Sequence, residues 1–212
     1  LSSDDRTRAT GLAILNELLD RRFISSYPIL KEKVLPLLKS ASNDVVNQSF
    51  ALLKRYGMEV EGLSMLANEN DPTQRQKALM LIRANLDTRY LPILRVLAAD
   101  EFKPLKEEAA LLLLEKYDDN AAKLILAGIY HADLQKEIAI GRTEIGYGVQ
   151  FHDRISKILK IAPKLDDASF AGEFGELLCT GRVYGFLATA LIDSIKQIGK
   201  PGVPYLREVL RK

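Results

Sequence analysis

The feature that most restricts what this chain can fold into is a helical pattern that recurs about every thirty residues. Short polar turns alternate with amphipathic segments, and four of these segments align in one frame: Val46–Leu53, Gln74–Leu81, Leu105–Leu112 and Leu134–Gly141. Each frame carries two small or apolar residues at one offset, which we expect on the face that packs against the neighbouring unit: Phe50 with Ala51, Ala78 with Leu79, Ala109 with Ala110, and Ile138 with Ala139. The pattern predicts a right-handed α-solenoid, an α-α superhelix of stacked helical hairpins whose second helices are these frames.

Composition agrees with an all-α fold. Hydrophobic residues make up 47% of the chain and charged residues 27%, which is ordinary for a folded protein and too apolar for a disordered one. Long alternating runs of Val, Ile and Thr are missing, so β-strands have little support. We therefore expect one all-α domain over residues 1–212.

The charge balance argues against a nucleic-acid-binding surface. Thirty basic residues face 28 acidic ones, which gives a net charge of +2 with the signs mixed along the chain. A surface that follows phosphates needs a larger basic excess, although one face of a solenoid can concentrate charge without changing the sum. Nucleic acid is not an expected partner, and no apolar run approaches the roughly 20 residues of a membrane span.

Cys179 is the only cysteine of the chain, so no internal disulfide can form. We expect it to be a small buried side chain without chemistry of its own. A soluble, cytoplasmic protein is the expectation. A secreted or periplasmic location stays open, because a chain that begins at Leu1 rather than methionine could have lost a signal peptide.

Prolines and polar turns divide the chain into units. We expect an N-terminal capping helix over residues 1–22 and regular repeats over 23–146, with Pro28 at a helix start and Pro36 inside a helix that it bends. The turns at residues 42–44 and 68–72 should end one helix and cap the next. Residues 187–212 should hold the last repeat and a C-terminal helix.

Two segments resemble HEAT repeats. The stretch from Asn70 to Ala78 is similar to the turn and second-helix start of a HEAT unit, and Ala190 to Leu206 is similar to the end of one bacterial HEAT-like unit and the start of the next. The short period resembles the repeats named after phycobilisome lyases. The resemblance implies that the residue after the turn, Arg75, bridges neighbouring units. Its counterparts in the other frames are Asn47, Lys106 and Gln135.

The repeat register is lost over residues 147–186, an irregular, glycine-containing insertion. Seven of the 13 glycines lie in or just before it: Gly141, Gly146, Gly148, Gly172, Gly175, Gly181 and Gly185. Glycine weakens a helix interior by about 1 kcal/mol relative to alanine, so these residues need another reason. Tight helix crossings or a bend are one interpretation, and a loop or pocket on the binding side is the other. Within the insertion we expect helices over residues 152–161 and 168–180.

Two histidines give the only enzyme-like pattern. The order His131, His152, Asp153 and Asp193 resembles the ligand order of HD-domain metal phosphohydrolases. The glycine and lysine that usually follow the His-Asp pair are missing, and Asp133 and Asp153 also suit helix capping. We therefore predict no catalytic residue, no metal and no cofactor. A metal-dependent hydrolase that uses these histidines remains an alternative hypothesis, as does a lyase-like or chaperone-like factor that acts on a bound protein.

The leading hypothesis is a non-enzymatic scaffold or adaptor that binds another protein through the concave face made by the second helices. The sequence does not identify the partner protein or the oligomeric state of the chain. The expected contact residues are polar or amphipathic side chains on those helices and on the irregular segment: Arg75, Lys106, Arg142, Tyr147, His152, Arg154, Arg182 and Tyr184.

Overall fold

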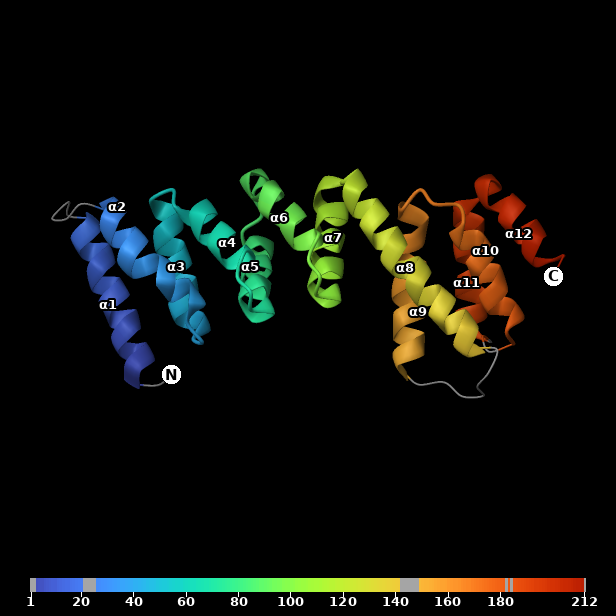
Figure 1. Cartoon of the computed structure of the whole chain (residues 1–212), viewed down its shortest axis with the longest axis horizontal. Coiled ribbons are helices and arrows are strands. Elements are labelled where there is room, and N and C mark those ends of the chain that lie inside the picture. The colour runs from blue at the N-terminus through green and yellow to red at the C-terminus, as the bar shows by residue number, and fades with distance from the viewer. Residues whose placement is uncertain (1–2, 21–25, 142–148, 182, 184, 212) are drawn as a thin grey trace. The chain divides into compact units, whose positions relative to one another are not determined.

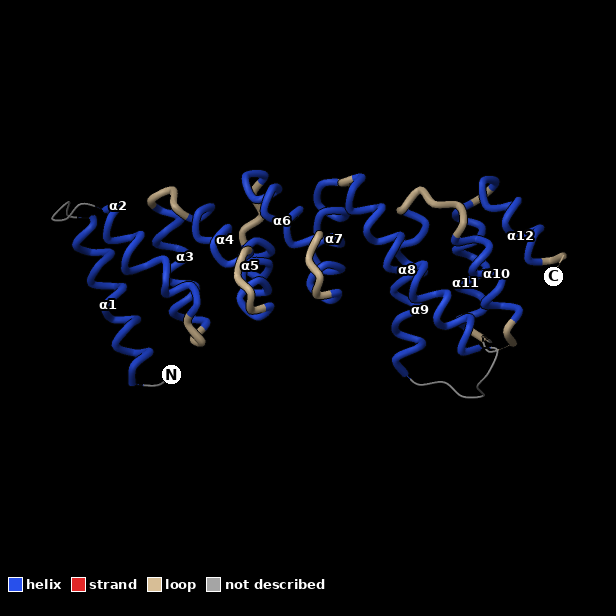
Figure 2. Tube along the Cα trace, in the orientation of Figure 1, coloured by secondary structure: helices blue, strands red, loops and turns tan. Residues whose placement is uncertain are grey.

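The structure, a computed structural model, describes residues 3–20, 26–141, 149–181, 183 and 185–211. All regular elements within these ranges are helices (Figure 2), which confirms the all-α prediction. None of the described helices is long and apolar enough to cross a membrane. The chain divides into two compact units, residues 1–113 and 114–212. We call them the N-terminal and C-terminal units and describe each by itself.

The N-terminal unit alternates slanted and upright helices along the chain (Figure 1). Its described elements are α1 (Ser3–Asp20), α2 (Ser26–Ile29), a π-helical turn (Leu30–Val34), a 3-10 helix (Leu35–Lys39), α3 (Asn43–Arg55), α4 (Glu59–Ala67), α5 (Pro72–Ala84), a 3-10 turn (Thr88–Tyr90), α6 (Leu91–Ala98) and the first part of α7 (Lys103–Tyr117). Helix α4 packs against α3, α5 and α6, and α1 packs against α3. The second helices predicted from the repeat are therefore α3, α5 and α7.

A side-chain oxygen accepts a backbone N–H at the start of each of these helices or just before it: Ser42 and Asp71 are the N-caps of α3 and α5, and Asp100 lies in the turn before α7. Ser42 Oγ accepts a hydrogen bond from the Val45 N–H, Asp71 Oδ1 from the Thr73 N–H and Asp100 Oδ1 from the Phe102 N–H. Such bonds satisfy amide groups that have no partner within the first turn of a helix. The three acceptor residues are equally spaced in the sequence, and the predicted turns before α3 and α5 are confirmed.

Proline positions explain two local features of the first helices. Around Pro36 the backbone changes from the π-helical turn to a 3-10 helix, because proline has no N–H to donate and its ring crowds the preceding turn. Pro92 and Pro204 instead lie in the first turns of α6 and α12, where the missing N–H has no helical acceptor. The predicted disturbance at Pro36 is therefore a change of helix type.

The C-terminal unit is helical throughout its described part. It holds the end of α7 and then α8 (Asn120–Gly141), α9 (Val149–Ile161), a 3-10 turn (Ala162–Lys164), α10 (Phe170–Cys179), α11 (Phe186–Ile198), a 3-10 turn (Lys200–Gly202) and α12 (Val203–Val209). Helix α10 packs against α8, α11 and α12. The helices expected over residues 152–161 and 168–180 are confirmed as α9 and α10.

The fourth predicted frame was wrong. Leu134–Gly141 is the last part of the single 22-residue helix α8, with no turn before it. The pair Ala132-Asp133 does not break the helix, because Asp133 is bonded to Arg154 of α9 instead of capping a new helix. Gly128, the one glycine in the helix interior, lies exposed and is tolerated there.

The paired residues of the four frames are buried only in part. The first member of every pair is buried, as predicted: Phe50, Ala78, Ala109 and Ile138. The second member is buried in α5 and α7, but Ala51 and Ala139 are exposed. On α3 and α8 the packed stripe is therefore narrower than expected.

Glycines of the irregular segment allow close helix crossings. A Cβ added at Gly172 would lie 3.0 Å from Tyr205 Cβ, and one at Gly175 would lie 3.2 Å from Leu206 Cδ2, so α12 approaches α10 closely at both positions. These contacts favour the tight-crossing interpretation for α10. Cys179, expected to be buried, is exposed because it is the last residue of α10.

Candidate functional site

Four of the predicted contact residues can be placed: Arg75, Lys106, His152 and Arg154. The other four, Arg142, Tyr147, Arg182 and Tyr184, lie outside the described residues.

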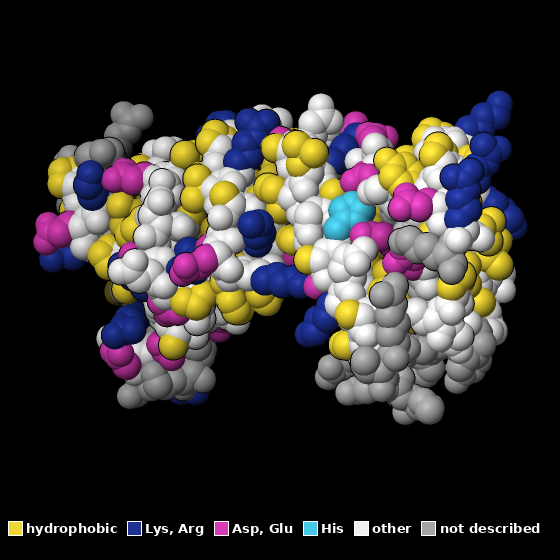
Figure 3. Space-filling model, turned by 45° about the vertical axis from the view of Figure 1, so that its right-hand side comes forward, with side chains coloured by type: hydrophobic (Ala, Val, Ile, Leu, Met, Phe, Trp, Pro, Cys, Tyr) yellow, Lys and Arg dark blue, Asp and Glu magenta, His cyan; other side chains and the backbone are white. Residues whose placement is uncertain are grey.

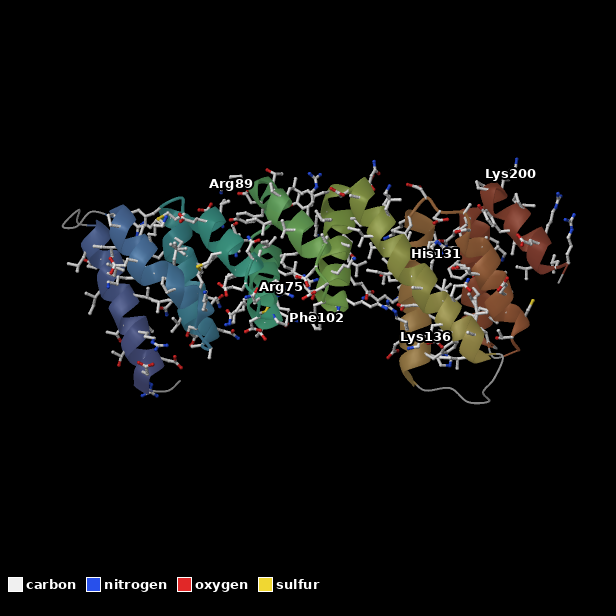
Figure 4. The ribbon with its side chains drawn as sticks, viewed as in Figure 1. Arg75, Arg89, Phe102, His131, Lys136 and Lys200 are labelled. Carbon is white, nitrogen blue, oxygen red and sulfur yellow. The ribbon has the colours of Figure 1, made fainter. Side chains whose placement is uncertain are left out.

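Arg75 is buried between the turns that precede α5 and α7 (Figure 4). Its Nε lies 2.6 Å from Asp100 Oδ2 and its Nη2 lies 3.0 Å from Asp100 Oδ1. Its Nη1 donates to the carbonyl oxygens of Glu69 and Asn70, each at 2.8 Å. The side chain links the turn before α5 to the turn before α7, and its three nitrogens all donate within the fold.

Lys106 stands half-buried on α7 near the same carboxylate. Burial acts to raise the pKa of Asp100, but the hydrogen bonds from Arg75 and Phe102 and the charges of Arg75 and Lys106 outweigh it and hold the pKa below its ordinary value. Asp100 is therefore ionised at neutral pH, and Lys106 contributes to its electrostatic surroundings.

The densest polar cluster of the described residues surrounds His131 on α8 (Figure 4). His131 Nδ1 lies 2.7 Å from Glu173 Oε2, and His131 Nε2 lies 2.9 Å from Asp167 Oδ2. The imidazole stacks on Phe170, with ring centroids 4.0 Å apart and planes 10° apart. We call His131, Gln135, Asp167, Ser169 and Glu173 the His131 cluster. It joins α8 to α10 and to the residues just before α10.

Gln135 completes the cluster one turn further along α8. Its Nε2 donates to Glu173 Oε1 at 2.8 Å, so both oxygens of that carboxylate bond to α8. Gln135 occupies the frame position of Arg75, and it also makes an inter-helix contact. Figure 3 shows histidine atoms at the surface with acidic side chains beside them.

The two carboxylates favour the charged form of His131. The hydrogen bond with Glu173 raises its pKa above the ordinary value of 6.5; burial opposes the shift, and Asp167 adds to it. Burial acts to raise the pKa of Asp167, but hydrogen bonds with Ser169 and His131 outweigh it and the pKa is lowered. The surroundings of His131 thus favour the charged form of its ring, and those of Asp167 favour the carboxylate.

Ser169 gives the cluster some likeness to a serine–histidine–acid triad. Its Oγ lies 3.2 Å from His131 Nε2, opposite the bond from Nδ1 to Glu173. However, Asp167 occupies the same Nε2, and Ser169 Oγ donates to Asp167 Oδ1 at 2.6 Å. Both ring nitrogens of His131 already face carboxylates and the serine hydroxyl is bonded to Asp167, so the arrangement suits a structural link better than nucleophilic catalysis.

Arg154 links α9 to α8. Its guanidinium is bonded to Asp133 Oδ2 and lies over the Tyr130 ring, 5.2 Å from the ring centroid. His152, two residues before Arg154 on α9, is exposed, and its ring is edge-on to that of Phe151. Asp133 and Arg154 therefore hold two helices of the C-terminal unit together.

No group of three or more His, Cys, Asp or Glu side chains in the described ranges is arranged to hold a metal ion. Both ring nitrogens of His131 face carboxylates of the chain itself. Asp193, the last residue of the suggested ligand order, pairs with Lys196 at 2.9 Å. These contacts give the metal-hydrolase alternative no support.

Sequence reasoning missed Asp167, Ser169 and Glu173. Ser169 and Asp167 carry a local signal, because Asp167 Oδ1 accepts the Ser169 N–H just before α10, an Asx turn that the pattern of residues 166–170 could have suggested. Glu173 carries none, since its partner is 42 residues away in the sequence. Comparison of the chain with known protein families, with curated proteins and with solved structures finds no match.

Proposed function

We propose that this chain is a non-enzymatic scaffold or adaptor that binds a partner protein on the concave face of a right-handed solenoid of HEAT-like hairpins. The observation that carries the proposal is the equal spacing of Ser42, Asp71 and Asp100, whose side chains accept backbone N–H groups where α3, α5 and α7 begin or in the turn just before. Helical hairpins that recur at a fixed interval stack on their neighbours, and such stacks present an extended face for another macromolecule.

The link between Arg75 and Asp100 supports the same proposal. It ties the turn before α5 to the turn before α7 through one buried side chain, which fixes the spacing of two second helices. A face whose helices are held at a fixed spacing loses little conformational entropy when a partner binds, so more of the contact energy appears as affinity.

The polar clusters favour a scaffold over an enzyme. Arg75, His131 and Arg154 are each used to connect one helix or turn with another. A catalytic group needs a position from which it can reach a substrate with the correct charge. Both ring nitrogens of His131 face carboxylates, of Glu173 and Asp167, so the side chain is better suited to holding α8 on α10.

Site-specific photo-crosslinking tests the proposal. Benzoylphenylalanine replaces Gln48 on α3 in one protein and Val96, an exposed residue of the first helix α6, in another. After irradiation in a lysate of the source organism, we expect discrete crosslinked proteins from position 48 and none of these from position 96. Equal crosslinking at both positions, or none at position 48, contradicts binding by the second-helix face.

A further inference from the structure

Two hollows on the N-terminal unit are lined by equivalent residues of α3 and α5. The first, of about 400 Å³, lies between α1 and α3, and the α3 side is made by Gln48, Ala51, Leu52 and Arg55. The second, of about 260 Å³, lies between α5 and α7, and the α5 side is made by Gln76, Leu79, Met80 and Arg83. Each set has the spacing i, i+3, i+4, i+7 and occupies the same place in its frame, with glutamine first and arginine last.

This stripe differs from the one that packs into the core. The core stripe of α3 includes Val46, Phe50 and Leu53, all at most 4% exposed. In the hollows, Leu52 and Leu79 are buried and form part of the floor, whereas Ala51 is exposed and Met80 is 60% exposed. An apolar stripe at helical spacing is normally covered by another element. Here one apolar side chain of each set is exposed: Ala51, the second lining residue of α3, and Met80, the third lining residue of α5.

The glutamine at one end of each hollow suits a peptide group. A glutamine amide carries both a donor and an acceptor, which match the C=O and N–H of a backbone. Neither Gln48 nor Gln76 has a recorded side-chain partner in the part of the chain that the structure describes. A helical ligand would have used its backbone groups internally, so the amides favour an extended segment.

The arginine at the other end of each hollow suits a carboxylate. Both Arg55 and Arg83 are exposed, and each already has a partner in its hollow: Arg55 Nη1 donates to Asn16 Oδ1 at 3.1 Å. Arg83 Nη1 pairs with Glu108 Oε1 at 2.6 Å, which occupies one part of a guanidinium with five N–H donors. Lys54, also exposed, stands beside Arg55 and adds a further positive charge at the same end of α3. An acidic ligand side chain is therefore complementary to this end of the face, and a basic one is not.

We infer that the hollows of α3 and α5 bind one extended, acidic segment of a partner protein, with an aliphatic side chain in each hollow. The inference rests on the proposed scaffold function and adds the chemistry of the partner. Neighbouring packed helices lie about 8–10 Å apart. The way from the first hollow to the second crosses α3 and α5, which is two helix spacings, so the hollows are about 16–20 Å apart. An extended chain covers that distance in about five or six residues, which sets the spacing of the two aliphatic side chains.

Selection from a library of random 12-residue peptides, displayed on phage against the whole purified chain, tests the inference. We expect the selected sequences to be rich in Asp and Glu and to carry two aliphatic residues five or six positions apart. The affinities of the selected peptides are then measured by fluorescence anisotropy with the wild-type chain and with variants. Met80→Glu and Arg83→Glu should each weaken binding at least tenfold.

The control has the same charge change in the other unit. Lys136 is exposed on α8, and Lys136→Glu should leave peptide affinity within twofold of the wild type. Circular dichroism melting of each variant shows whether it is folded. Because Met80 and Arg83 are exposed, both variants should melt within a few degrees of the wild type.

Several results would overturn the inference. Basic selected peptides would contradict an acidic ligand. Peptides that bind the two α5 variants as tightly as the wild type would show that they bind elsewhere on the chain. In both cases the scaffold proposal survives. Self-association of the chain that Arg83→Glu abolishes in sedimentation assigns the face to a second copy instead. If no peptide is enriched and position 48 gives no crosslinked protein, both the inference and the proposed function fail.

Discussion

Arg75 and Asp100 form a two-point salt bridge across 25 residues of sequence, with their side chains 10% and 7% exposed. The same guanidinium bonds two carbonyl oxygens of the turn at residues 69–70. Breaking such a pair on one side leaves a buried charge without its partner. The pair is therefore the first place at which to test what holds the hairpins of the N-terminal unit together.

Arg75→Ala should lower the melting temperature by about 5 °C or more, because it leaves the Asp100 carboxylate and two backbone carbonyls without their donor. Arg75→Lys should recover only part of the loss, since an ammonium group cannot bond both carboxylate oxygens in the same planar geometry. The measurement is thermal unfolding followed by circular dichroism. Arg8→Ala, which removes an exposed i,i+4 pair with Asp4, is the control and should change little. Equal effects of Arg75→Ala and Arg8→Ala would refute the structural role of the link.

His131 should titrate above its ordinary pKa of 6.5, because Glu173 and Asp167 stabilise its charged form. Because the pKa of His131 is raised in the folded state, its bonds in the His131 cluster contribute their full stability below pH 6.5. That contribution is lost as the pH rises through the folded-state pKa. The chain has only two histidines, so ring-proton NMR with His131→Gln for assignment gives the titration directly. Glu173→Gln should lower the pKa of His131.

Asp167, whose pKa is lowered, sets the acid end of the pH range in which the His131 cluster stabilises the fold. Its contribution to stability is present above its ordinary pKa and is lost as the pH falls through the folded-state value. The contact between α8 and α10 should therefore be strongest between the two limits, and His131→Gln should remove the decline at the alkaline limit. A wild-type His131 that titrates at 6.5 or below would contradict this account of the cluster.

Local signals made part of this structure predictable. Caps such as Ser42 and Asp71 act on amides within three residues, so the starts of α3 and α5 could be predicted from the sequence around them. The partners of His131 lie 36 and 42 residues away, and no local pattern encodes such a contact. The continuity of α8 was missed for a similar reason. Asp133 looks like a cap in the sequence, but its partner, Arg154, comes from the next helix.

Gly202→Ala should destabilise the C-terminal unit. The added Cβ would lie 2.6 Å from Ala171 Cβ and 3.2 Å from Ile198 Cγ2, so the backbone of α10 or of the 3-10 turn would have to move. Overpacking of this kind costs about 1–3 kcal/mol. Gly128→Ala is the matched control: it lies exposed within α8, with no neighbouring atom within 4 Å of its new Cβ. It should stabilise the chain by up to about 1 kcal/mol. Urea unfolding that ranks the two variants in the reverse order would contradict the close crossing.

Ala110 and Ala139 occupy the same offset in two frames of the repeat but differ in burial. Ala110 is 0% exposed on α7, whereas Ala139 is exposed on α8. Ala110→Asp should place an unpaired charge in the core of the N-terminal unit and reduce the free energy of unfolding by several kcal/mol, about 3–5. Ala139→Asp leaves its charge in water and should cost about 0.7 kcal/mol or less, the difference in helix propensity.

Urea unfolding of both variants, followed by circular dichroism, measures the contrast between these two alanines. The repeat alone assigns the same environment to both positions, because they share an offset. The structure assigns them different environments, because α8 continues without a turn and its last part is not a second helix. Similar destabilisation by the two substitutions would favour the repeat register over the continuous α8. A large loss for Ala110→Asp alone would support the continuous helix and the packing of α7 in the N-terminal unit.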